Sequence, residues 1–341
     1  MIYKQFFSYV FFIMGTVIGA GILSLPLVYK SLGWLSIPLI LISFIFTFLA
    51  SLIFVKVYKK PALELFNGYL KHLTYFAVFI SGFSALIAYT IGISELLNSK
   101  LALLIIPLTL FLISFFELKR EMNFDAFFSF IVFTLLISII ITLFQHANYS
   151  ILNHINLDYK NIFLALSVTM IAFSGYFSLT EVYKFEKKNY SKIVLVALGL
   201  VTLLYSCYTI LALANGLQEL AYNKTKNQLF YLTHVFAFFS IFTSAMGVFV
   251  GLKTHLKWKT LSHIIPFILL ITSFLFIKWN ISFEQTLALG SRFGLSIFVG
   301  FLPFYYIIKH KNDKKNQKFN NFDIFFSFCV SIFFLLLVFF S

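Results

Sequence analysis

The stretch GTVIGAGILSLPL, residues 15–27, decides how this chain folds. It carries Gly15, Gly19 and Gly21 within seven positions, and Pro26 follows five residues further on, all inside a long apolar run. Glycine in a helix interior costs about 1 kcal/mol relative to alanine, and proline removes a backbone donor. A helix broken in lipid leaves polar backbone groups that must line a cavity or be buried in protein. The stretch therefore predicts an interrupted membrane helix whose backbone groups serve a site.

The composition of the whole chain indicates an integral membrane protein. Of the 341 residues, 60% are hydrophobic and 11% are charged, and the mean hydropathy is +0.94. A helical span needs about 20 apolar residues. We therefore expect an all-α membrane protein with eleven spans, near residues 6–28, 34–56, 74–97, 100–116, 124–144, 161–183, 191–215, 228–252, 262–278, 284–308 and 322–340.

The net charge of +14 is distributed over the predicted loops in a pattern that fixes an orientation. If the N-terminus is inside, the inner loops hold 19 of the 26 Lys and Arg residues and the outer loops hold six. This positive-inside bias predicts a cytoplasmic N-terminus and an external C-terminus. Nucleic-acid binding would need one basic face, so we expect no nucleic-acid partner. The expected partners are the lipid bilayer and a small-molecule substrate, and no obligate protein partner is evident. A chain rich in Lys, Ile, Phe and Asn indicates a prokaryotic plasma membrane.

A second stretch echoes the first. Residues 15–30, GTVIGAGILSLPLVYK, and residues 169–184, TMIAFSGYFSLTEVYK, share six identities in sixteen positions. Five crossings separate the two stretches, so the copies have opposite orientations in the membrane. We expect one transmembrane domain over 1–341, with broken first and sixth spans. Its inverted repeats cover about 6–144 and 161–308, and span 322–340 is peripheral.

The two predicted breaks would place NH groups and carbonyls around one site. The positive end of the outer half-helix suits a carboxylate, and the carbonyls of both unwound turns suit an ammonium group, so the pattern fits an amino acid zwitterion. The alternative is that Gly15 and Gly19 form a GxxxG face for helix packing. The predicted substrate-binding residues are Val17, Ile18, Gly19, Ala20, Gly21, Ala172, Phe173, Ser174 and Gly175.

On these residues the chain resembles amino acid permeases of the tryptophan/tyrosine (hydroxy and aromatic amino acid) branch. That branch belongs to the amino acid/auxin permease family, in the amino acid-polyamine-organocation superfamily. Residues 15–27 are similar to the family's first-span motif, 88–92 (AYTIG) to its Ala-Tyr-x-x-Gly stretch, 241–252 (IFTSAMGVFVGL) to its eighth span and 288–303 to its tenth. The family commonly has a proline near Thr180, which this chain lacks.

The resemblance implies a fold and a function. It implies a five-plus-five inverted-repeat transporter and adds Tyr89 to the substrate-binding set. The implied function is ion-coupled symport of aromatic or other neutral amino acids by alternating access, and the protein is not expected to be an enzyme.

The resemblance also implies a cation site. In sodium-coupled members of the superfamily, a cation lies between the unwound first span and hydroxyl residues of the eighth, and Thr243 and Ser244 match that place, with the backbone of Thr16 and Val17. Oxygen ligands suit a hard cation. Hydroxyls in membrane helices also bond to carbonyls of their own helix, so both interpretations stay open. Some proton-coupled relatives use a lysine in the fifth span, which is absent here. The expected coupling ion is Na⁺ or H⁺, and no other cofactor is expected.

Two charged residues lie near the outer ends of spans three and ten. Glu95 and Arg292 form a candidate external gate, or both snorkel to the interface. Two other functions stay open: an amino acid sensor of the same fold that transports nothing, and an intramembrane transferase. A transferase would need clustered acids or histidines, and the acidic residues here are scattered along the sequence.

Overall fold

The structure is a computed structural model. It describes residues 2–19, 21–58, 62–115, 118–153, 155–216, 228–256, 261–281, 283, 285–286, 290–311 and 319–340. Within these ranges the chain is helical and contains no strand. The first half comprises α1 (Ile2–Val17), α2 (Gly21–Val28), η1 (Gly33–Leu35), α3 (Ser36–Val57), α4 (Ala62–Leu65), α5 (Tyr69–Leu96), η2 (Lys100–Leu104), α6 (Ile105–Ile113), α7 (Leu118–Phe144) and η3 (Tyr149–Asn153).

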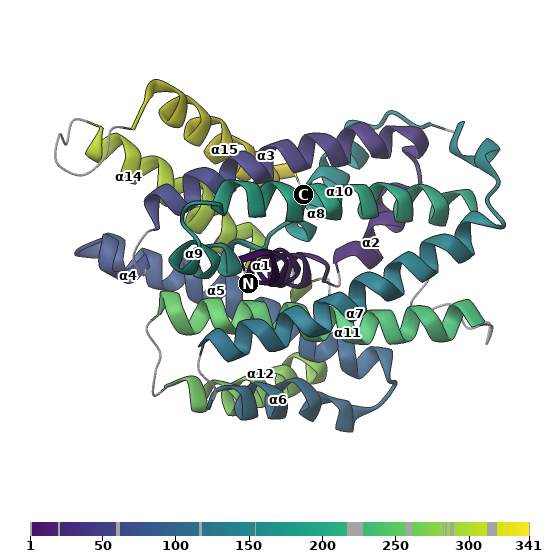
Figure 1. Cartoon of the computed structure of the whole chain (residues 1–341), viewed down its shortest axis with the longest axis horizontal. Helices are drawn as coiled ribbons and strands as arrows, with labels where there is room; N and C mark the ends of the chain where they lie inside the picture. The colour runs from purple at the N-terminus through teal and green to yellow at the C-terminus, as the bar shows by residue number, and fades with distance from the viewer. Residues whose placement is uncertain are drawn as a thin grey trace.

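The second half repeats the alternation of long and interrupted helices. It comprises α8 (Tyr159–Ala172), α9 (Tyr176–Phe185), α10 (Tyr190–Ala214), α11 (Gln228–His255), η5 (Leu261–His263), α12 (Ile265–Lys278), the π-helical η6 (Gly290–Phe301), α14 (Leu302–His310) and α15 (Asn321–Phe340). The long helices lie side by side along the longest axis of the molecule (Figure 1).

Helix length and composition confirm an all-α membrane protein. Among the described residues, six helices are long and apolar enough to cross a membrane, and the bent pair α1 and α2 makes up to seven. Shorter apolar helices cover Lys100–Ile113, Ile265–Lys278 and Asn321–Leu336. Each of the eleven predicted spans therefore contains helix. The boundaries of the predicted repeats and the peripheral role of 322–340 stay predictions.

The first and sixth spans are broken, as predicted. α1 and α2 meet at an angle of 54°, and Phe173, Ser174 and Gly175 separate α8 from α9. The second half-helices begin alike. The Ser24 hydroxyl donates to the carbonyl of Gly21 at 2.7 Å, and the Ser178 hydroxyl donates to the carbonyl of Gly175 at 2.7 Å. These two serines form one of the six aligned identities, so the echo in the sequence has a structural counterpart.

Helix packing places the breaks at the centre of the molecule. α1 packs against α7, α10 and α11, and α5 packs against η6. Small residues permit this approach, because a Cβ on Gly294 would lie 2.6 Å from the Ser81 Cα, and a Cβ on Gly247 would lie 2.8 Å from the Thr16 Cβ. α15 packs against η6, α14, α3 and α8.

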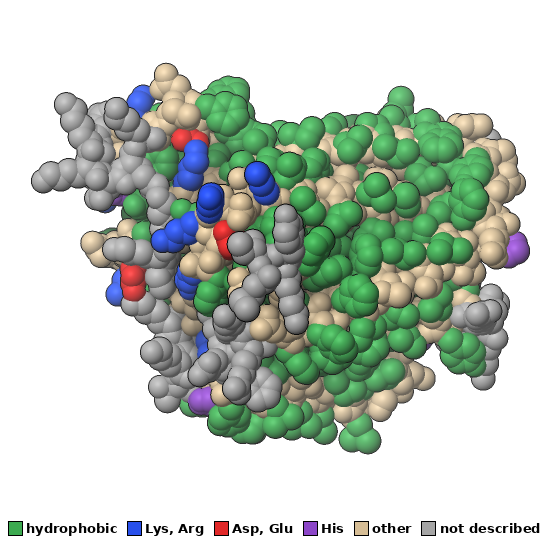
Figure 2. Space-filling model, in the orientation of Figure 1, with side chains coloured by type: hydrophobic (Ala, Val, Ile, Leu, Met, Phe, Trp, Pro, Cys, Tyr) green, Lys and Arg blue, Asp and Glu red, His purple; other side chains and the backbone are tan. Residues whose placement is uncertain are grey.

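The surface agrees with a membrane environment. Figure 2 shows hydrophobic side chains covering most of the face in view, while the basic side chains gather at the end where α9 and α14 lie. A bilayer solvates an apolar belt of this kind, whereas water does not. The grouping of basic side chains at one end agrees with the charge bias of the predicted inner loops.

Candidate substrate and cation site

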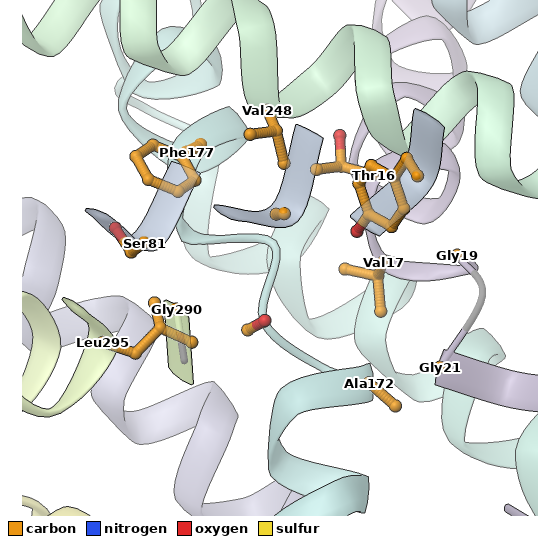
Figure 3. A pocket seen from close by; sticks show the side chains of 13 residues that line it. Thr16, Val17, Gly19, Gly21, Ser81, Ala172, Phe177, Val248, Gly290 and Leu295 are labelled. Carbon is orange, nitrogen blue, oxygen red and sulfur yellow. The ribbon is translucent and has the colours of Figure 1, made fainter. Parts of the chain in front are cut away.

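The two helix breaks share one cavity. It has a volume of about 40 Å³ and is lined at the breaks by Val17, Gly19, Gly21, Ala172 and Ser174. Figure 3 shows Gly19 and Gly21 on one side of the cavity, with Phe177, Ser81 and Leu295 on the other side. This volume holds a few water molecules, so an amino acid can enter only if the walls move apart.

The predicted substrate-binding residues divide into two groups. Val17, Gly19, Gly21, Tyr89, Ala172 and Ser174 line the cavity. Ile18, Phe173 and Gly175 are buried beside it without being part of its lining. Ala20 lies outside the described residues. Thr16, Ser81, Ala85, Phe177, Val248, Gly290 and Leu295 complete the lining. The structure thus brings together most of the predicted set, whose role in binding stays a prediction.

Four helix ends meet at this cavity. α1 and α8 end at the breaks with their carbonyls, while α2 and α9 begin there, at Gly21 and next to Gly175. The amino end of a helix carries a partial positive charge and the carboxyl end a partial negative charge. The backbone alone therefore provides the cavity with hydrogen-bond donors at its positive helix ends and acceptors at its negative helix ends.

Hydroxyl groups from α11 satisfy the carbonyls at the end of α1. Ser244 donates to the carbonyls of Gly15 and Thr16, both at 3.2 Å, and Ser240 donates to the carbonyl of Ile18 at 2.8 Å. Thr243 reaches the carbonyl of Gly15 at 3.2 Å and also two carbonyls of its own helix, each at 3.1 Å. A broken membrane helix needs such partners.

The predicted cation site thus has a defined set of oxygens. It consists of the hydroxyls of Thr243 and Ser244 and the carbonyls of Gly15 and Thr16. The carbonyl of Val17 faces Tyr205 instead. The 3.2 Å separations exceed the 2.7–2.8 Å usual for a hydroxyl donor, and oxygens of this kind are what a hard cation prefers.

Tyr205 on α10 connects the two breaks. Its hydroxyl lies 2.8 Å from the carbonyl oxygen of Val17 and 3.0 Å from that of Ala172. The Tyr205 side chain is fully buried. Sequence reasoning missed Tyr205 and Ser240, because a tyrosine or serine inside an apolar span carries no signal that distinguishes it from a packing residue.

Tyr89 approaches the site from α5. Its hydroxyl points towards Gly19, and its side chain interacts with that of Ser244. The tyrosine that the resemblance added to the substrate site therefore lies beside the predicted cation ligands.

A cluster of aromatic rings lies next to the cavity, near the end of α11. Phe177 lines the cavity and stacks on Phe298 with ring centroids 5.7 Å apart. The His255 ring contacts Phe298 at 5.3 Å, and its Nε2 lies 3.0 Å from the Thr180 hydroxyl. Thr180 stands where the family commonly has proline, and α9 is a continuous helix there. The ring cluster thus extends from the cavity lining at Phe177 to His255 at the end of α11.

The predicted external gate is described only in part. Glu95 is exposed near the end of α5. The backbone of Arg292 lies in η6, which packs against α5, but its side chain lies outside the described part of the chain. Pairing between Glu95 and Arg292 stays a prediction.

No protein-family model and no curated relative matches this sequence. Solved structures match it closely in fold. A manganese transporter of Eremococcus coleocola, in complex with an aromatic bis-isothiourea compound, is 13% identical with a TM-score of 0.61, over 99% of this chain and 86% of that chain. MHP1, a nucleobase-cation-symport-1 family transporter in a closed conformation with bromovinylhydantoin bound, is 12% identical with a TM-score of 0.59, over 97% of this chain and 90% of that chain.

The fold, the broken spans and the apolar belt define an integral membrane protein with the fold of secondary transporters. Both of these structural neighbours are transporters. The likeness to the tryptophan/tyrosine permease branch rests on the sequence motifs alone.

Proposed function

We propose that this protein is a secondary active transporter of amino acids that works by alternating access. The observation that carries the proposal is the meeting of four half-helix ends at one cavity, lined by Val17, Gly21, Ala172 and Ser174. An amino acid carries one carboxylate and one ammonium group, so it needs a positive and a negative partner in the same small space. Opposed helix ends provide both without any charged side chain.

The proposal assigns each end of the zwitterion to one kind of helix end. The carboxylate binds at the amino end of α2, near Gly19 and Gly21, where the absence of side chains lets a ligand approach the backbone. The ammonium binds at the carbonyl ends of α1 and α8. Tyr205 holds two of these carbonyls, so an ammonium group that binds there competes with the Tyr205 hydroxyl.

The proposed substrates are aromatic or other neutral amino acids. Apolar and small side chains complete the lining, including Ala85, Phe177, Val248 and Leu295. An acidic or basic substrate side chain would lack a charged partner there, and burying an unpaired charge is costly. The family resemblance supplies the preference for aromatic substrates.

The Eremococcus coleocola neighbour is a manganese transporter, so a metal ion is the second candidate substrate. Among the described residues, no group of three or more His, Cys, Asp or Glu side chains could hold a metal ion. Transition metals are selected by such ligands. The donor set of this cavity therefore favours an organic zwitterion over a transition metal.

The proposed membrane is a prokaryotic plasma membrane, with the N-terminus inside. The basic end seen in Figure 2 would then face the cytoplasm. The proposed mode is symport driven by Na⁺ or H⁺. The oxygen set at Thr243 and Ser244 suits Na⁺, and the ion test below separates the two.

Uptake into proteoliposomes tests the function. The purified protein is reconstituted, and labelled L-tryptophan, L-tyrosine, L-leucine and L-alanine are offered with sodium and proton gradients imposed separately. We expect uptake of at least one neutral amino acid. Unlabelled tyrosine should compete with it, whereas tyramine and 3-(4-hydroxyphenyl)propionate, which each lack one end of the zwitterion, should not. Binding without exchange would instead identify a sensor, and equal competition by tyramine would contradict the carboxylate site.

A further inference from the structure

A buried carboxyl group lies on α7 beside the predicted cation site. The Asp125 side chain has no exposed surface, and neither of its carboxylate oxygens has a hydrogen-bond partner among the residues that the structure describes. A buried carboxylate without a partner is strongly disfavoured, so the group must bind a cation or stay neutral during part of its working cycle. It is the kind of intramembrane acid that indicates function.

The position of Asp125 links it to the broken first span. Ser129 lies one helical turn further along α7, and its hydroxyl bonds to the carbonyl of Asp125 at 2.7 Å. A Cβ on Gly15 would overlap the Ser129 side chain and lie 3.5 Å from the Thr243 Cβ. Residues four apart share one helix face, so Asp125 lies on the face of α7 that packs against α1.

The neighbouring helices offer Asp125 no counter-ion among the described side chains. α1, α10 and α11 pack against α7, and their described charged or histidine side chains are Lys192, His234, Lys253 and His255. None of these pairs with Asp125. Lys253 lies 3.4 Å from the carbonyl of Ser114, and His255 contacts Thr180. The Tyr9 ring stacks on Phe185, and the Tyr205 hydroxyl bonds to the carbonyls at the breaks.

This environment suits a proton and does not suit a metal ion. A desolvated sodium ion needs several oxygen ligands, and no described group forms a hydrogen bond with the Asp125 carboxylate. A proton needs one oxygen only, and its binding removes the charge that burial disfavours. The predicted cation site near Thr243 differs from Asp125, because it groups several oxygens but includes no carboxylate.

A groove lies close to Asp125 on the predicted cytoplasmic side. This groove, of about 520 Å³, runs between α1 and α7, lined by Gln5, Ser8, Asn123, Met122 and Ala126 among others. Met122 lies three residues before Asp125, and Ala126 directly follows it. The Ser8 hydroxyl donates to Asn123 at 3.1 Å and ties α1 to α7 at this end. Because the helix break separates α1 from α2, a swing of α1 away from α7 would open the groove to Asp125.

We propose that the Asp125 carboxyl binds the proton that is co-transported with the substrate. The inference rests on the proposed function and adds the coupling ion to it. A proton from the outer side reaches the carboxylate by way of the cavity and the hydroxyls of Thr243 and Ser129. The resulting neutral acid permits the substrate-loaded protein to change from its outward-open to its inward-open state. When α1 opens inward, the proton passes to water in the groove, and the carboxylate returns.

The test compares net uptake with exchange in proteoliposomes that contain the full chain. Asp125→Asn mimics the protonated acid, so the substrate-loaded protein still changes between its outward-open and inward-open states but releases no proton. The matched control is Asp323→Asn, because Asp323 is also buried but lies on α15 and pairs with Lys56. The substrate is the amino acid that the uptake panel identifies, and a pH dye trapped in the vesicles reports the proton flux.

For the wild-type protein and Asp323→Asn we expect accumulation of substrate under an acid-outside gradient. For one-to-one symport, the ratio of internal to external substrate can reach about tenfold per pH unit. Asp125→Asn should keep its exchange of external for internal substrate, now independent of pH, and lose gradient-driven accumulation and proton flux. Asp125→Glu, which keeps the carboxyl group, should retain accumulation with a shifted pH profile. If Asp125→Asn does not fold, the pH profile of Asp125→Glu and the dye signal of the wild-type protein still test the proposal.

Two results would overturn the inference and are distinguishable. If the wild-type protein exchanges the amino acid but a proton gradient does not drive uptake, or if Asp125→Asn accumulates substrate as the wild-type protein does, the proton site is wrong and the transport function stands. If the wild-type protein exchanges no amino acid, both the function and the site are wrong.

Discussion

The hydroxyl oxygen of Tyr205 lies 2.8 Å from the carbonyl oxygen of Val17, across 188 positions of sequence. The same hydroxyl lies 3.0 Å from the carbonyl oxygen of Ala172 in the other broken span. A phenol has one proton to donate, so the two carbonyls share it. A change at one break therefore alters the hydrogen bonding at the other, and α10 connects the two spans whose backbone forms the proposed substrate site.

We expect Tyr205→Phe to destabilise the protein and weaken substrate binding. The substitution keeps the ring and removes the donor, which leaves two buried carbonyls with fewer partners. An unsatisfied buried acceptor costs about 1–3 kcal/mol. The checks are the thermal unfolding midpoint of the purified protein and substrate binding measured by calorimetry.

Tyr208→Phe is the matched control for this prediction. Tyr208 lies on the same helix and is fully buried, and its hydroxyl has no hydrogen-bond partner in the described part of the chain. Its removal should leave the midpoint unchanged or raise it, because a buried unpaired hydroxyl is lost. Equal loss of stability in both variants would mean that the Tyr205 hydrogen bonds are unimportant.

Gly21→Ala should disrupt the first break. A Cβ on Gly21 would lie 2.8 Å from both the Cα and the Cβ of Ala172, so the half-helices of the two broken spans could no longer approach. We expect a lower unfolding midpoint together with loss of substrate binding. The structure thereby shows that Gly21 permits the close approach of α2 to α8, and its role in ligand access stays a prediction.

Gly199→Ala is the control, since a Cβ on Gly199 in α10 would have nothing within 4 Å. Alanine is favoured over glycine in a helix by about 1 kcal/mol, so this variant should be as stable as the parent or more so. A Gly21→Ala protein that binds substrate and unfolds at the parent's temperature would contradict the close approach of α2 and α8.

Ser244→Ala tests the role of the predicted cation ligands. The Ser244 hydroxyl donates to the carbonyls of Gly15 and Thr16, so its loss should loosen the end of α1 and slow uptake. Because we infer that a proton is the coupling ion, the reduction should be equal in sodium and in potassium buffers. Ser240→Ala, which removes the bond to the carbonyl of Ile18, should behave in the same way. A rise in the half-maximal sodium concentration for Ser244→Ala alone would assign the site to Na⁺ and contradict proton coupling.

Much of the fold was predictable because it depends on local composition. Apolar runs near the length of a bilayer specify spans, and the glycines of residues 15–21 specify a break, since both effects act along one helix. The repeat was readable because Ser24 and Ser178 occupy equivalent places and form the same bond. The site was predictable in part. Val17, Gly19, Gly21, Ala172 and Ser174 meet at the cavity. Tyr205 could not be recognised, because its partners are far away in the sequence, and Asp125 could not, because only the folded structure shows that it is buried without a described partner.

The sequence by itself determined the membrane environment, the helical class, the two interruptions and the charge bias, because each follows from the transfer of side chains and backbone groups between water and lipid. Only the tertiary structure decided which hydroxyl meets which carbonyl and which acid lacks a partner. Gly15 lies beside Ser129, and Thr16 lies beside Gly247, through packing between helices distant in the chain. Hydrogen bonds act over about 3 Å, so a side chain acquires its function from neighbours that only the folded arrangement brings within reach.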